Sequence, residues 1–353
     1  EYGHAKDDDE LMQVNLSYVS AVSNNRPLSY CLYPGSIHDT SEVNHTIKQF
    51  ERYNYKNIGF IFDRGYYSDN LLKKLYNDGY FFIFMLKDNY DFVDKLIKSN
   101  RIRLIEQFDC YIGEYKVSGI TNKINLSNNS SKPIYCYVHI YYDSYRAVND
   151  KNILLSNIEI LEKQLDELYE NDKTLTKDKL SRFEKYFKLK YNPLGYLISY
   201  EKDLKKIKAL NDKLGFFALM SRKEMKADEV LAIYKQRDSI EKLFRALKSS
   251  LNFDHPGVHT KQALEAKVFL TFLASIIRNE IFISRRKLSD QDKKNYTVPI
   301  IIKQLNAIEA SLNSNNIYTR RYALTAKQKK LLSLFNIKEK DIDNIINEFN
   351  SNT

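Results

Sequence analysis

Three cationic side chains, a phenol and a lone carboxylate recur at helical spacing between residues 227 and 253, a stretch without proline or glycine. At about 100° per residue they all fall within roughly 40° of one line along a helix. They are Tyr234, Arg237, Glu241, Arg245 and Lys248. An apolar stripe about a quarter-turn away can dock the helix on a core. It consists of Ile233, Ile240, Leu243, Phe244 and Leu247. The polar face suits either a phosphate backbone or a solvated, ion-paired surface, and this stretch alone does not separate the two.

A further carboxylate, Asp63, directly follows a short apolar run at 57–62 that is typical of a strand covered on both faces. In open α/β sheets, ligand sites lie at the carboxyl ends of the strands, where this residue is expected. A carboxylate in that place can bind a divalent metal through oxygen. It can equally be a turn residue that stabilises Gly65 and the start of the next helix.

The elements that must position these residues alternate over the first part of the chain. Two strands are predicted at 11–22 and 28–33, joined by a turn at 24–27, and a helix follows at about 40–53. After the strand that ends at Asp63, Ser68 is placed to cap a helix at 69–78, which Gly79 closes. A buried strand at 80–86 completes the alternation. The pattern predicts an α/β sheet with helices packed on it.

The segment from 88 to 211 breaks this alternation. Short strands are predicted between 103 and 141, with a polar loop at 122–132. Apolar residues then recur at a 4-3-4-3 spacing, which favours a packed helix over a dedicated coiled coil because the repeat covers only about two heptads. They are Leu154, Ile158, Leu161, Leu165 and Leu168. A buried strand at 215–221 directly precedes the helix of the five polar side chains.

The rest of the chain is predicted to be mainly helical. Residues 264–283 form a largely apolar helix, and the tail from about 298 is helical with a basic interruption at 318–321. No apolar run reaches about 18 residues, so no membrane span is predicted. The first ten residues are polar and acidic, unlike a signal peptide.

Charge favours a polyanionic partner. The 353 residues carry 55 Lys and Arg against 45 acids, a formal charge of +10, and such a surplus attracts phosphate backbones. The alternative is that the charge surplus only reflects the overall composition of the chain, in which Lys, Asn, Ile and Tyr are all abundant. The three cysteines lie far apart without metal-site spacing, so buried thiols are favoured over a metal site or a disulfide. Among the six histidines only His255 and His259 are close, and Pro256-Gly257 between them disfavours a helical metal pair.

Several blocks together resemble the bacterial insertion-sequence transposases of the DDE type. Tyr234, Arg237, Glu241 and Lys248 spell that family's Y-x2-R-x3-E-x6-K signature. F-D-R-G-Y-Y-S at 62–68 is similar to the block around its second catalytic aspartate. Y-P-G-S-I-H-D at 33–39, G-H-A-K at 3–6 and G-F-F-A-L-M-S at 215–221 are similar to further blocks, and all of them occur in the family's order.

The resemblance implies an α/β, ribonuclease-H-like catalytic core interrupted by a β-rich plus helical insertion, with a helical C-terminal tail. The expected parts are 1–87 and 212–290 for the core, 88–211 for the insertion and 291–353 for the tail. Asp63 and Glu241 are implied to bind two Mg²⁺ or Mn²⁺ ions, with their carboxylates within about 12 Å of each other.

The implied partner is double-stranded DNA, at the element's ends and at the target. Tyr234, Arg237 and Lys248 are implied to hold the terminal phosphates. Arg245 has no place in the signature and is expected to form a structural ion pair. A homodimer on paired ends, in the bacterial cytoplasm at the nucleoid, is implied as well.

One departure from the family pattern concerns the first catalytic aspartate, which the family places upstream of the G-x-x-K block. That block begins here at Gly3, and Asp7, Asp8 and Asp9 follow it, where a loop is expected. The sequence is therefore expected to be an amino-terminally truncated transposase, inactive by itself although its basic surface binds DNA. The alternatives are a catalytically inactive copy that only binds DNA or partner subunits, and a ribonuclease-H-like nuclease that cuts without joining.

Overall fold

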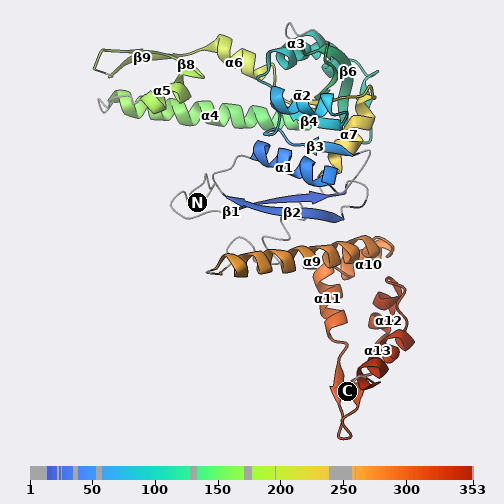
Figure 1. Ribbon diagram of the computed structural model, residues 1–353. Helices are drawn as coiled ribbons and strands as arrows, with labels where there is room; N and C mark the ends of the chain where they lie inside the picture. Colours follow the sequence, from blue (N-terminus) through green and yellow to red (C-terminus); the bar gives the residue numbers. More distant parts are fainter. Residues whose placement is uncertain are drawn as a thin grey trace. The chain divides into compact units, whose positions relative to one another are not determined.

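The computed structural model describes residues 14–21, 24, 26–34, 39–52, 58–127, 133–170, 177–194, 196–237, 257–258 and 260–351. The chain divides into two compact units, which are described separately (Figure 1). One unit spans Asp39–Lys235, and the other combines Glu1–His38 with Gln236–Thr353. These units differ in their bounds from the four parts expected from the sequence, whose boundaries remain a prediction.

A six-stranded mixed sheet organises the unit 39–235. Its strands lie in the order β3-β4-β10-β7-β6-β5. Their bounds are β3 (Gly59–Phe62), β4 (Phe81–Leu86), β10 (Phe216–Ser221), β7 (Tyr135–Tyr142), β6 (Val117–Asn125) and β5 (Tyr111–Ile112). Strands β3 and β4 are parallel, and each of the other neighbouring pairs is antiparallel. The parallel pair is joined through a helix, as parallel neighbours require.

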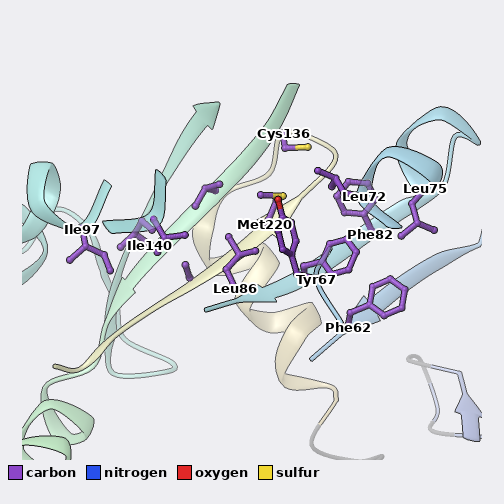
Figure 2. Close-up of a cluster of buried hydrophobic side chains, with 14 of the residues drawn as sticks. Phe62, Tyr67, Leu72, Leu75, Phe82, Leu86, Ile97, Cys136, Ile140 and Met220 are labelled. Atoms are coloured by element: carbon purple, nitrogen blue, oxygen red, sulfur yellow. The ribbon is translucent and has the colours of Figure 1, made fainter. Parts of the chain in front are cut away.

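Helices cover both faces of this sheet. The helices of the unit that pack on one face are α1 (Asp39–Arg52), α2 (Asp69–Asn77) and α3 (Asp91–Glu106), and their apolar residues meet the strands in one large buried cluster. Figure 2 shows part of it, with Leu72 and Leu75 of α2 beside Phe82 and Phe62 of the strands. Helix α7 (Ala227–Lys235) packs on the opposite face, where a second buried cluster forms.

The local signals in this part of the sequence are confirmed. Ser68 caps α2, its side chain accepting a hydrogen bond from the Leu71 N–H, and Gly79 follows the helix with a φ of +85°. A residue with positive φ ends the helix at little steric cost only when it is glycine. The predicted strands at 57–62, 80–86 and 215–221 correspond to β3, β4 and β10.

Strands from the predicted insertion belong to the same sheet as the predicted core. Strand β7 pairs along its length with β10, with Ile140 opposite Ala218, and β6 pairs with β7. Main-chain pairing therefore runs without a break from β3 to β6. The part of the unit that leaves the sheet is shorter and begins after β7.

That part is a helical arm that extends from the sheet (Figure 1). It contains α4 (Ser144–Glu170), α5 (Lys177–Glu184), β8 (Phe187–Tyr191), β9 (Leu197–Lys202) and α6 (Leu204–Asn211). The predicted packed helix is confirmed, because the residues at 154, 158, 161 and 165 of α4 are buried against α5 and the β8–β9 hairpin. At the root of the arm, the Asp143 N–H donates to the Gly215 carbonyl at 3.0 Å. Gly215 has a φ of +80°, and a Cβ there would lie 2.5 Å from the Ala147 Cβ.

The other unit contains a β-hairpin and a helical tail. Strands β1 (Val14–Ser20) and β2 (Pro27–Pro34) form a two-stranded antiparallel sheet. The remaining described elements are α9 (Lys261–Arg285), α10 (Asp290–Asn295), α11 (Val298–Asn306), β11 (Ala310–Leu312), β12 (Tyr318–Arg320), α12 (Ala326–Ser333) and α13 (Glu339–Ser351). Among the described helices, none is long and apolar enough to cross a membrane.

The hairpin and the six-stranded sheet belong to different compact units, so a shared sheet between its strands and those at 57–62 and 80–86 stays a prediction. Within the described part of their own unit, β1 and β2 pair with each other. Their aromatic side chains pack on α9, with the Tyr30 and Phe272 ring centroids 4.9 Å apart, and Arg26 forms a 2.6 Å ion pair with Glu280.

A buried histidine lies on the α7 face of the six-stranded sheet. His139 is fully buried in β7, with Nδ1 2.9 Å from Thr121 Oγ1 and Nε2 2.9 Å from Ser221 Oγ. The Ser221 hydroxyl donates to the Lys223 carbonyl at 2.7 Å, so it accepts a hydrogen bond from the His139 Nε2–H. The Thr121 hydroxyl also lies 3.3 Å from the Met225 carbonyl, to which it donates. Burial lowers the pKa of His139 from 6.5 to about 4.

This shift predicts that the unit loses stability in mild acid. Because the folded pKa lies below the unfolded one, the neutral-histidine contribution is fully present above pH 6.5 and is lost as the pH falls toward 4. Between about pH 7.5 and pH 5 the free energy of unfolding should fall by about 2 kcal/mol. Urea denaturation followed by circular dichroism measures it. His45→Gln, at a side chain that is 53% exposed, should keep this loss, and a free energy that is constant over the range would contradict the prediction.

Candidate active site

Asp63 occupies the first position after β3, at the carboxyl end of that strand. Its Oδ1 accepts a hydrogen bond from the Arg64 N–H at 2.7 Å, and its carbonyl accepts one from the Tyr66 N–H at 3.1 Å. The turn role that the sequence allowed is therefore present. The residue is nevertheless exposed, so the same carboxylate is also presented to solvent.

Helix α7 is held on the sheet by apolar burial and by a buried hydrogen bond at its start. Val230 and Leu231 are fully buried in the cluster that includes Ile83 of β4. The Tyr141 hydroxyl donates to the Ala227 carbonyl at 2.7 Å and is itself buried. Burial raises the pKa of Tyr141 well above its usual range, so this phenol stays a donor. The start of α7 is thereby tied to β7.

Docking of α7 brings the signature tyrosine to the aspartate. The Tyr234 hydroxyl lies 3.4 Å from Asp63 Oδ1 and 2.9 Å from Met85 Sδ, and the residue is only 7% exposed. Asp63 and Tyr234 are separated by 171 positions in sequence. Two of the residues that the sequence assigned to one site are therefore neighbours in the structure.

The remaining predicted site residues divide between described and undescribed positions. Helix α7 ends at Lys235, and Arg237 follows it in a turn with a partly buried side chain. Glu241, Arg245 and Lys248 lie outside the described residues, as do Asp7, Asp8 and Asp9. The approach of the Asp63 and Glu241 carboxylates therefore stays a prediction.

Arg64 was not assigned a role from the sequence. Its Nε is buried and has no hydrogen-bond partner. The sequence places a cation directly after Asp63, but it gives no sign that no described acidic residue forms an ion pair with it. That information comes only from the three-dimensional contacts.

The chemistry of the donors fits a hard divalent cation. Mg²⁺ and Mn²⁺ prefer carboxylate oxygen, which an exposed aspartate at a strand end supplies. The soft Met85 sulfur lies beside the Tyr234 hydroxyl and is a poor ligand for such ions. Asp63 is therefore suited to be one ligand, and Glu241 remains the expected second.

A comparison with protein families identifies the chain. A model of the transposase DDE domain matches residues 12–277. The chain belongs to this family. The matched range contains Asp63, Tyr234, Arg237, Glu241 and Lys248. No match is found among curated proteins.

Membership in the transposase DDE family gives the geometry a functional context. It supports an enzyme that acts on DNA, in a family that generally uses divalent metal ions. It is also consistent with a ribonuclease-H-like domain built around the mixed sheet. The exposed Asp63 and the buried Tyr234 beside it are the described part of that domain's candidate site.

The packing of α7 makes a stability prediction. Leu231→Ala should lower the free energy of unfolding by about 3 kcal/mol, because Leu231 is fully buried and truncation leaves a cavity. Asp63→Asn changes an exposed side chain and should stay within about 0.5 kcal/mol of the parent. Urea denaturation of both variants measures the difference. Equal losses would mean that α7 does not depend on its apolar face for docking.

Proposed function

We propose that this DDE domain belongs to a bacterial insertion-sequence transposase that cuts DNA at its element's ends and joins the freed 3′-OH to target DNA. The supporting observation is the contact between Tyr234 and Asp63, two positions that the family match covers together.

Asp63 and Glu241 are proposed to hold two Mg²⁺ or Mn²⁺ ions. Two such ions activate the attacking oxygen and stabilise the leaving oxygen during in-line displacement at phosphorus. The chain's own residues fix the geometry. The Asp63 carboxylate is oriented by the Arg64 N–H, and its place at the strand end is set by the β3–β4 pairing.

The cationic and phenolic side chains of the signature are proposed to hold the DNA end. Arg237 offers a planar fork that matches phosphate oxygens, and Lys248 offers a compact positive charge. Tyr234 would contact the same end from beside Asp63, where its hydroxyl lies. A pair of copies acting on the two ends of one element, within the bacterial nucleoid, completes the proposal.

A strand-transfer assay tests this function. A protein that contains this domain should join pre-cleaved element ends to a plasmid when Mg²⁺ or Mn²⁺ is present. Glu241→Gln should keep DNA binding near the parent level and abolish joining, because it removes a metal ligand but no phosphate contact. Hydrolysis without joining would instead identify a nuclease. Binding without either reaction would identify a copy that acts only by binding.

The phosphate contacts make a separate prediction. Arg237→Ala and Lys248→Ala should each weaken binding to element ends and lower the slope of log affinity against log salt by about one. Fluorescence anisotropy at several KCl concentrations measures both quantities. Lys163→Ala, at a side chain that is 70% exposed on the arm and paired with Glu159, is the matched control. Unchanged slopes for Arg237→Ala and Lys248→Ala would make this face a solvated helix surface.

A further inference from the structure

Arg64 differs from the other partly buried arginines of its unit. Those arginines have partners: Arg101 with Asp212 at 3.5 Å, Arg146 with Asp150 at 3.3 Å, and Arg222 with the Tyr80 carbonyl at 3.0 Å. Arg64 forms no ion pair with any described acidic residue, and its buried Nε has no acceptor. A buried guanidinium N–H without an acceptor lowers stability. The fold therefore retains a buried N–H without an acceptor next to Asp63, which lowers its stability.

The neighbouring Asp63 carboxylate does not supply the missing acceptor for Arg64 Nε. Asp63 Oδ1 accepts the backbone N–H of Arg64 at 2.7 Å rather than its guanidinium. The Asp63 carboxylate is thus held by a main-chain N–H. The Arg64 guanidinium can still donate a hydrogen bond to a further acceptor. An oxygen of an anion bound at the proposed metal site beside Asp63 can supply this acceptor.

The turn leaves room for a large ligand. Gly65 is exposed, and a Cβ built on it would meet no atom within 4 Å. The backbone of the turn is therefore open at this position. The planar guanidinium fork matches the oxygens of a phosphate group.

We infer that Arg64 is an additional phosphate-binding residue, whose guanidinium takes a non-bridging oxygen of the DNA phosphate that is presented to Asp63. The inference rests on the proposed function, because it requires DNA at this carboxylate. It adds a contact from the β3–α2 turn to those proposed for the signature helix. It also explains why a partly buried arginine that pairs with no described carboxylate is placed directly after Asp63.

Binding of duplex DNA by variants of the full chain tests the inference. The probe is a fluorescein-labelled duplex of about 30 base pairs, titrated at several KCl concentrations so that counterion release can be counted. Arg64→Gln should weaken binding about tenfold near 0.1 M salt and lower the salt slope by about one. Its thermal midpoint without DNA should equal or exceed that of the parent, because the unpaired donor is removed. Arg64→Lys should restore the slope but not the affinity, since it keeps the charge without the fork.

Arg101→Gln is the matched control, because Arg101 is also partly buried but is paired with Asp212. It should leave affinity and slope at the parent values. Parental affinity and slope in Arg64→Gln would overturn the inference while leaving the proposed function standing. A lowered thermal midpoint in Arg64→Gln would also overturn it, by showing a structural role. Failure of the parent chain to bind the duplex at any salt concentration would overturn the inference together with the proposed function.

Discussion

The packing of α7 against the six-stranded sheet is the contact on which the candidate site depends. Asp63 and Tyr234 come from segments 171 positions apart, and no local structure can bring them together. Burial of the apolar face of α7 holds the helix on the sheet, and the Tyr141–Ala227 hydrogen bond fixes where the helix starts. A one-residue slip of a helix rotates its side chains by about 100°, so the fixed start determines that Tyr234, and no neighbour, meets the aspartate.

Polar groups under α7 contribute to the same register. His139 connects β6 to β10 through Thr121 and Ser221, and Ser221 in turn holds the Lys223 carbonyl in the loop that leads to α7. Each of these buried groups has a partner, which is the condition under which a polar network makes a core specific rather than weak. The sheet thus determines the path of the chain into α7 as well as supporting the helix.

The sequence was sufficient for several local elements. The Ser68 cap, the Gly79 stop and the strand before Asp63 follow from residue types, because caps and buried strands have local physical causes. Pairing between distant strands does not. The strands predicted between 103 and 141 pair with β10 through β7, and residue types alone do not indicate this pairing. Whether Arg64 forms an ion pair could likewise not be predicted from the sequence, since it depends on which carboxylates other segments bring near.

The root of the helical arm has a consequence for how such a domain can be modified. The arm leaves the sheet after β7 and returns just before β10, and these two strands are antiparallel neighbours. The ends of the excursion are joined by the Asp143–Gly215 hydrogen bond at 3.0 Å. From the standpoint of the sheet, the whole of residues 144–214 is an elaborated hairpin loop. Two strand ends that lie this close can be connected by a short turn or by a long segment, because the entropic cost of closing a loop rises only slowly with its length. Insertions between β7 and β10 can therefore add new binding surface to the domain without altering the strand that precedes Asp63.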